Sequence, residues 1–344
     1  MEPITILIVI AIIVFAIAMI WWSQSKESVS TDVLYSDALN AILKGENTVA
    51  IKLLKQVVGH DSDNIGAYLQ LGNLLRSVNP QQSTKIHQSL TVRPKLSKAV
   101  SKEIHQALAL DYAELSDYKR AKIEADLVLK YDKKNLWVHQ FLLQLAEKQK
   151  EWDSAIELAT KVQKLTGNRD FRQLAKIQLQ AGTDQLENGE NKKALQHFQN
   201  AIKLDPTFGK PSIHIGNIYE EEDNLKKAIV NWEKYLINEE RSDAKIYKKI
   251  ESALFDLGRF SEVDQFYSRI LDNKPNDNIA IVKLTTLLKD KGDIDGAIKL
   301  VDNAINKNND FISARLIKIK ILLEKANPVD LNNQIDELIE IIGK

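Results

Sequence analysis

Histidine is the residue type in this chain with the widest chemical repertoire, and six histidines are spread along its 344 residues. A metal site on one helix needs two ligands three or four positions apart, and no pair has that spacing. We therefore expect each to be a surface or partly packed side chain: His60, His87, His105, His139, His197 and His214. The sequence contains no cysteine, which excludes disulfides and thiolate metal ligands.

Sequence motifs for catalysis are also missing. There is no Gly-rich phosphate loop, no Gly-x-Ser-x-Gly elbow and no candidate catalytic triad. The 47 basic residues balance the 47 acidic residues, so net charge gives no reason to expect nucleic-acid binding. We expect a protein that is not an enzyme, with no cofactor, no metal and no nucleic-acid partner.

Positive charge is concentrated in one stretch. From Asn64 to Lys102 the sequence has no Asp or Glu. It does have six basic residues, which we predict form a basic patch: Arg76, Lys85, Arg93, Lys95, Lys98 and Lys102. Near a membrane, each such charge contributes about 1 kcal/mol of attraction to anionic headgroups, and an acidic partner would be attracted similarly. The alternative interpretation is a solvated loop in a neutral protein.

The elements that would position these residues follow from a spacing of 34 residues. A first set of small and aromatic residues, Gly182, Ala194, Phe198 and Ala201, recurs 34 positions later as Gly216, Ala228, Trp232 and Tyr235. This is the period of the tetratricopeptide repeat, a pair of antiparallel helices with small residues where they cross. Pro206 ends the second helix of its repeat because proline has no amide hydrogen.

The same period extends along the chain. The residue near the start of each second helix gives eight positions: Ala50, Ser83, Ala121, Ala155, Ala194, Ala228, Val263 and Ala297. We predict an all-α tetratricopeptide-repeat solenoid of about eight helical hairpins over residues 33–311. Residues 312–344 would add a last hairpin that lacks the small residues of the repeat, and we interpret it as a terminal cap.

The N-terminus predicts a membrane anchor. Ile4 to Trp22 is a run of 19 residues without charge, close to the ~20 that cross a hydrocarbon core as a helix. We predict a transmembrane helix within residues 1–25 and a linker at 26–32. A cleaved signal peptide is the alternative, although Met1-Glu2-Pro3 carries no Lys or Arg. Lys26 favours a cytoplasmic location for the repeats.

The first helices of stacked repeats form the concave surface on which such arrays bind peptides. The register predicts a partner-binding groove lined by Asn73, Arg76, Leu110, Asn217, Glu220, Lys248 and Phe255. Leu69 and Ile213 stand where a carboxylate clamp needs lysine, so chaperone C-termini are not the expected ligands. The mixed apolar and polar lining suits a helical or extended protein segment.

Three segments resemble the lipopolysaccharide assembly protein B (LapB) family: Leu71–Ser77 (LGNLLRS), Lys85–Leu90 (KIHQSL) and Glu151–Ile156 (EWDSAI). The resemblance runs from the anchor to about residue 325. It implies an adaptor in the bacterial inner membrane with repeats facing the cytoplasm. Such an adaptor brings a membrane-bound protease together with a deacetylase of lipopolysaccharide synthesis.

This chain departs from the family at its C-terminus. The family ends in a rubredoxin-like metal module with two Cys-x-x-Cys pairs, whereas this chain has no cysteine. Two explanations stay open, a shortened relative that keeps anchor and scaffold, or a divergent protein with another partner. A scaffold for a secretion or pilus system is the alternative function.

Overall fold

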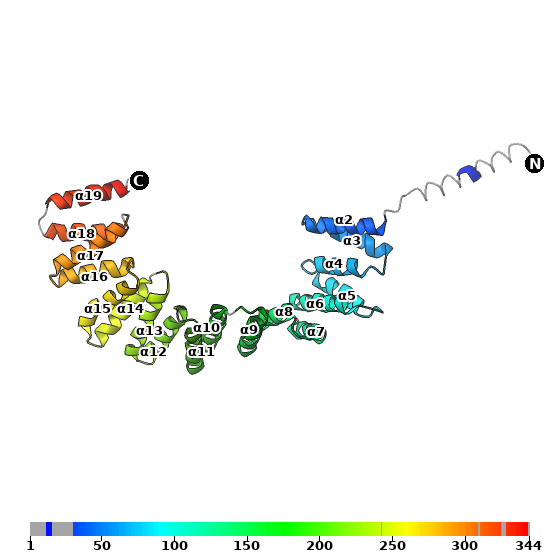
Figure 1. The fold of residues 1–344 in the computed structure, drawn as a ribbon, viewed down its shortest axis with the longest axis horizontal. Coiled ribbons are helices and arrows are strands. Elements are labelled where there is room, and N and C mark those ends of the chain that lie inside the picture. Colours follow the sequence, from blue (N-terminus) through cyan, green and yellow to red (C-terminus); the bar gives the residue numbers. More distant parts are fainter. Residues whose placement is uncertain are drawn as a thin grey trace, which may run out of the picture. The chain divides into compact units, whose positions relative to one another are not determined.

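The computed structural model describes residues 12–15, 30–168, 170–241, 243–308, 310–324 and 328–342. These residues form helices joined by short turns, and none of them is in a strand (Figure 1). This confirms the prediction of an all-α fold. The chain divides into two compact units, Met1–Leu145 and Ala146–Lys344, and each is described by itself.

Unit 1 is a stack of helical hairpins. Its helices are α2 (Thr31–Leu43), α3 (Asn47–His60), α4 (Ile65–Leu75), α5 (Pro80–Thr91), α6 (Lys98–Glu114), α7 (Tyr118–Tyr131) and most of α8 (Leu136–Lys148). The even-numbered helices are the first helices of hairpins and the odd-numbered ones the second helices. α2 packs on α3, α4 on α5 and α6 on α7, and successive hairpins meet through α3–α4 and α5–α6.

Unit 2 repeats the arrangement. Its helices are α9 (Trp152–Thr166), α10 (Phe171–Glu187), α11 (Asn191–Leu204), α12 (Lys210–Glu221), α13 (Leu225–Asn238), α14 (Ala244–Asp256), α15 (Val263–Asn273), α16 (Asn278–Asp290), α17 (Ile294–Lys307), α18 (Ile312–Glu324) and α19 (Pro328–Ile342). A short 3₁₀ turn, η1 (Phe260–Glu262), precedes α15. The eight positions that we named at the starts of second helices lie in the odd-numbered helices, from Ala50 in α3 to Ala297 in α17.

Small residues make the helix crossings possible. The eight predicted positions at the starts of second helices are all buried. In the first helices, Gly182 faces the ring of Phe198, and a Cβ added to this glycine would lie 2.5 Å from that ring. Gly216 faces Trp232 in the same way, and Gly72 faces His87. Each glycine therefore lets a large ring from the second helix lie against the backbone of the first.

Local signals define the helix ends. Asn79 accepts a hydrogen bond from the backbone N–H of Gln82 and is followed by Pro80, which needs no partner in a first turn. Most turns within hairpins, although not the α4–α5 turn, use one left-handed residue. It is glycine in some turns, such as Gly189 (φ +77°), but not in others, such as Ser116 (φ +59°).

The predicted anchor at 1–25 lies outside the described residues, apart from 12–15, and so does most of the linker. None of the helices in the described ranges combines the length and the apolar character needed to cross a bilayer. Helix α2 begins at Thr31, two residues before the predicted start of the solenoid.

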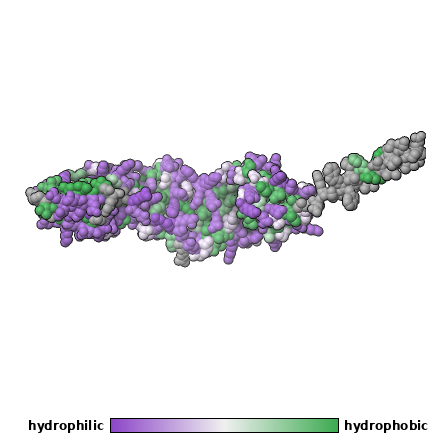
Figure 2. Space-filling view, turned by 90° about the horizontal axis from the view of Figure 1, so that it is seen from above, coloured by the Kyte–Doolittle hydropathy of each residue, from purple (hydrophilic) through white to green (hydrophobic). Residues whose placement is uncertain are grey.

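The C-terminal hairpin buries one face and exposes another. α18 and α19 pack together, and Arg315 of α18, which is buried, forms an ion pair with Glu337 of α19. α19 leaves four aliphatic side chains exposed: Val329, Ile335, Ile339 and Ile342. Figure 2 shows a hydrophobic patch over this end of the chain, on a surface that is otherwise largely hydrophilic. A terminal cap usually has a polar outer face, so this apolar surface departs from that expectation.

Candidate protein-binding surface

A groove of about 330 Å³ lies on the first helices of unit 1. It is lined by residues of α4, α6 and α8: Leu69, Gln70, Asn73, Glu103, Gln106, Ala107, Leu110 and Trp137. No second helix contributes to this lining. The structure therefore brings together two of the predicted groove residues, Asn73 and Leu110.

The lining combines two kinds of chemistry. Leu69, Leu110 and Trp137 offer apolar surface for a side chain of a partner. The indole of Trp137 stacks on Phe141 with 5.1 Å between ring centroids and 7° between planes, which fixes its orientation. The side-chain amides of Gln70, Asn73 and Gln106 can donate to and accept from a peptide backbone, and Glu103 favours a basic residue beside it. This is the chemistry of a site for a peptide segment.

A buried carboxylate holds the helices beneath this groove. Asp111 of α6 is fully buried and receives the Nε–H of Arg76 at 2.7 Å. The Oγ of Ser83 lies 2.8 Å from Asp111 Oδ1, and Nδ1 of His87 lies 2.6 Å from Oδ2. The carboxylate thus links α4, α5 and α6, and its burial is offset by the cationic partner and by hydrogen bonds.

The guanidinium of Arg76 is held by hydrogen bonds to neighbouring residues. Its Nη2 donates to Asn73 Oδ1 at 2.7 Å and to the carbonyl of Ala107 at 3.3 Å. The guanidinium therefore orients a predicted groove residue, Asn73, while its own Nε–H is engaged by Asp111. We predicted Arg76 as a lining residue, and the structure does not place it among those that line the groove.

Ser83, His87 and Asp111 are the three residue types of a hydrolytic triad, but their arrangement is different. A triad needs the serine hydroxyl against Nε2 of the histidine. Here the hydroxyl of Ser83 lies 2.8 Å from the carbonyl of Gly72 and from Asp111, and Nε2 of His87 lies 3.3 Å from the carbonyl of Leu69. All three side chains are fully buried, so this cluster has no nucleophile facing a substrate.

The histidines differ in their surroundings. His87 is fully buried, which differs from our expectation of a surface or partly packed side chain. Gly72 leaves space for its ring and Asp111 satisfies Nδ1. His105 lies 2.7 Å from Glu124, and His214 stacks on Phe198. Within the ranges that the structure describes, no group of three or more His, Asp or Glu residues could hold a metal ion.

The predicted groove residues of unit 2 form a different cluster. Lys249 of α14 lies 2.5 Å from Glu220 and 3.3 Å from Asn217, both on α12. The indole N–H of Trp232 also donates to Asn217, at 3.1 Å. Lys248, which we predicted to line the groove, is exposed, and its neighbour Lys249 makes these contacts. Phe255 is 48% exposed and packs against Phe260, with 5.3 Å between centroids.

The predicted basic patch is divided among different roles. Arg93 donates to the carbonyl of Ser62 and lies over the ring of Tyr68, 4.7 Å from its centroid. Arg76 belongs to the Asp111 cluster. The remaining members are the exposed Lys85 on α5, the exposed Lys95 and Lys98 before and at the start of α6, and the half-buried Lys102.

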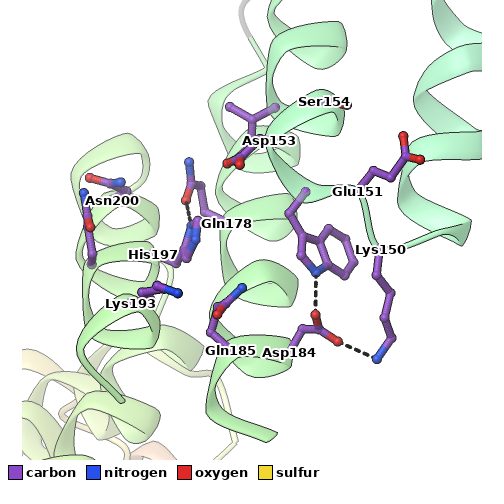
Figure 3. A pocket seen from close by; sticks show the side chains of 13 residues that line it. Lys150, Glu151, Asp153, Ser154, Gln178, Asp184, Gln185, Lys193, His197 and Asn200 are labelled. Atoms are coloured by element: carbon purple, nitrogen blue, oxygen red, sulfur yellow. Dashed lines mark hydrogen bonds and ion pairs between the residues drawn. The ribbon is translucent and has the colours of Figure 1, made fainter. Parts of the chain in front are cut away.

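A second hollow, of about 820 Å³, lies in unit 2 between α9, α10 and α11 (Figure 3). Asp184 receives hydrogen bonds from Lys150 at 2.5 Å and from the indole N–H of Trp152 at 3.1 Å, and both lower its pKa. His197 faces Gln178 at 2.7 Å, and burial lowers the pKa of His197. Our sequence analysis quoted Glu151–Ile156 only for its family resemblance and did not predict this site, because the partners of Asp184 lie 34 and 32 positions away, on another hairpin.

The chain is similar to curated proteins of one name. The lipopolysaccharide assembly protein B of Escherichia coli K12 is 21% identical over 239 residues, which are 69% of this chain and 61% of that protein. The protein of that name from Haemophilus influenzae is 23% identical over 300 residues, 83% of this chain and 74% of that protein. The chain thus spans less than two thirds of the length of its E. coli relative.

No family model matches the chain. Among solved structures, a tetratricopeptide repeat protein from Parabacteroides merdae is 15% identical, with a TM-score of 0.40. The match covers 74% of this chain and 97% of that one.

Proposed function

Because this chain is a LapB-like tetratricopeptide-repeat protein, we propose that it is a non-catalytic scaffold for lipopolysaccharide assembly that binds protein partners on its first helices. The observation that carries the binding role is the groove of unit 1, whose lining comes entirely from α4, α6 and α8. The name of the relatives supports the place of this role in the cell envelope.

In this proposal the groove holds a peptide segment by two kinds of contact. An apolar side chain of the partner packs against Leu110 and Trp137, and the amides of Asn73 and Gln106 bind its backbone. Asp111 and Arg76 keep α4 and α6 in register, so that the amides are positioned before the partner binds. Such preorganisation lowers the entropy cost of binding.

The proposal also includes a location. Residues 1–25 would anchor the protein in the bacterial inner membrane, since Ile4 to Trp22 has the length and apolar character of a spanning helix. The repeats would face the cytoplasm. The partners that the family resemblance implies are a membrane-bound protease and an enzyme of lipopolysaccharide synthesis, and the scaffold would bring them together.

Affinity capture of the full-length protein from its own membranes tests this function. The wild type should recover the protease and the lipopolysaccharide enzyme, and Leu110→Glu should recover less of them because it places a charge in the groove. Lys52→Glu is the control, since Lys52 is exposed on a second helix, α3, and lies outside the predicted basic patch. Recovery of secretion or pilus components instead would contradict the lipopolysaccharide role. Equal capture by wild type and Leu110→Glu would contradict the groove.

A further inference from the structure

A groove of about 410 Å³ runs between two second helices of unit 2, α11 and α13, with α12 as its floor. Its apolar lining comes from Ile202 on α11, Ile215 and Tyr219 on α12, and Val230 on α13. Ile215 is buried, whereas Val230 is 52% exposed. An exposed valine at the rim of an apolar hollow is a surface that a partner side chain could cover.

The helices on both sides of this groove carry an excess of positive charge. α11 and α13 have six exposed lysines: Lys192, Lys193, Lys203, Lys226, Lys227 and Lys234. α11 contains no Asp or Glu. The single acidic residue of α13, Glu233, is mostly buried and forms a two-point ion pair with Arg269, at 2.7 and 3.0 Å. In a chain with no net charge, these two helices are a basic surface.

The lysines are placed where they can contact a ligand in the groove. Lys226, Val230 and Lys234 are spaced four residues apart, so they follow one line along α13. The ammonium of Lys227 lies 4.9 Å from the centroid of the Tyr219 ring, over the floor of the groove. Apart from Glu233, the nearest acidic residues in sequence are Glu220 and Glu221 at the end of α12 and Glu222 and Asp223 in the turn before α13, and none of them lines the groove.

We propose that this groove binds an acidic, amphipathic segment of a partner protein. An apolar side chain of the segment would pack over Ile215 and Tyr219, and its carboxylates would pair with Lys226, Lys227 and Lys234. Charge complementarity selects this occupant, because the lining contains ammonium groups and no carboxylate. A helix whose apolar face enters a groove between two helices is a common mode of peptide recognition.

The shape of the groove favours a protein segment over a membrane surface. Side chains that insert into a bilayer project outward, whereas the floor residue Ile215 is buried between α11 and α13. This surface belongs to the second helices of unit 2, and the groove of the proposed function belongs to the first helices of unit 1. The inference therefore goes beyond the proposed function and does not depend on it.

Fluorescence anisotropy with two labelled peptides and the full-length protein in detergent tests the inference. The first is a helical peptide with leucine on one face and glutamate on its flanks, and the second has glutamine in place of each glutamate. The acidic peptide should bind the wild type, and the glutamine peptide should bind about tenfold more weakly because it cannot pair with the lysines. Added salt should weaken the binding of the acidic peptide.

Variants locate the site. Lys226→Glu/Lys234→Glu should weaken binding of the acidic peptide by about tenfold or more, and Val230→Asp should have an effect of similar size. The matched control is Lys52→Glu/Lys55→Glu, which reverses two exposed charges on α3 of unit 1, outside the predicted basic patch, and should leave binding unchanged. Circular dichroism verifies folding, and all five substituted side chains are exposed. If Val230→Asp unfolds the protein, the double charge reversal decides alone.

Four results would overturn the inference: no binding of the acidic peptide to the wild type, equal binding of the two peptides, equal loss with the unit 1 control, or unchanged binding by Lys226→Glu/Lys234→Glu. A parallel measurement with phosphatidylglycerol vesicles distinguishes a membrane role. If the α13 variant loses vesicle binding and keeps peptide binding, the surface is a lipid site and the proposal is wrong.

Discussion

The carboxylate of Asp111 and the imidazole of His87 are 2.6 Å apart, and both side chains are fully buried. They come from α6 and α5, and Arg76, the C-cap residue of α4, completes the group. One carboxylate therefore connects three successive helices beneath the candidate groove.

Replacing this carboxylate should destabilise unit 1. Asp111→Ala leaves Arg76, Ser83 and His87 without their shared acceptor, and removing one member of a buried ionic group costs about 3–5 kcal/mol of unfolding free energy. Urea denaturation followed by circular dichroism measures the loss. Asp126→Ala, which removes an exposed aspartate on α7, is the control and should change stability by less than about 0.5 kcal/mol. A similar small change for Asp111→Ala would show that the network contributes little.

The repeat itself could be predicted from the sequence, whereas this network could not. A 34-residue period with small residues at helix crossings predicts stacked antiparallel hairpins. In such a hairpin Gly182 lies against the helix that carries Phe198, as the structure shows. The partners of Asp111 lie 35, 28 and 24 residues away and belong to two other helices. Periodicity shows which face of a helix is buried, but it does not show which donors surround one aspartate among many.

The predicted groove residues illustrate the same limit. Asn73 and Leu110 are among the residues that line the unit 1 groove, whereas Arg76 is not. The choice between Lys248 and Lys249 depends on about 100° of helix rotation, which an approximate register does not resolve. Lys249 is the residue that reaches Glu220.

The turn residues offer a test of backbone strain. Ser116 has φ +59°, a conformation that costs a residue with a side chain about 1–2 kcal/mol. Glycine removes this strain, but it also gives the unfolded chain more conformational freedom, which offsets part of the gain. Ser116→Gly should therefore stabilise the protein by about 0.5–1 kcal/mol. Gly189→Ala should have the opposite sign, because Gly189 has φ +77° and open space around it, which leaves backbone strain as the only cost. The midpoint of urea unfolding measures both. Loss of stability in Ser116→Gly would contradict the strain argument.

His214 should make stability depend on pH. Burial lowers the pKa of His214, which stacks on Phe198 with 4.9 Å between centroids. The folded state therefore binds its proton less readily than the unfolded state, whose pKa is about 6.5. The stability that the protein has with a neutral His214 is therefore fully present above about pH 6.5, and part of it is lost as the pH falls below that value. His214→Phe should reduce the decrease in melting temperature between pH 7.5 and pH 5. If His214→Phe shows the same decrease in melting temperature as the wild type, other titratable groups cause that decrease.

Two glycines with opposite surroundings test the packing of the repeat. Alanine is favoured over glycine inside a helix by about 1 kcal/mol, so a glycine with open space around it should tolerate the change well. Gly59 on α3 has no atom within 4 Å of an added Cβ, and Gly59→Ala should therefore be neutral or stabilising by up to about 1 kcal/mol.

At Gly216 on α12, helix propensity also favours alanine over glycine. Here, however, an added Cβ would meet the ring of Trp232, which is fully buried. The ring cannot move outward without disturbing the core shared by α13 and α14. Overpacking of this kind costs about 1–3 kcal/mol, which exceeds the gain in helix propensity, so Gly216→Ala should be destabilising. Tryptophan fluorescence during urea unfolding follows the change, with Gly59→Ala measured alongside. If both variants were equally stable, the close approach of α12 and α13 would not depend on this glycine.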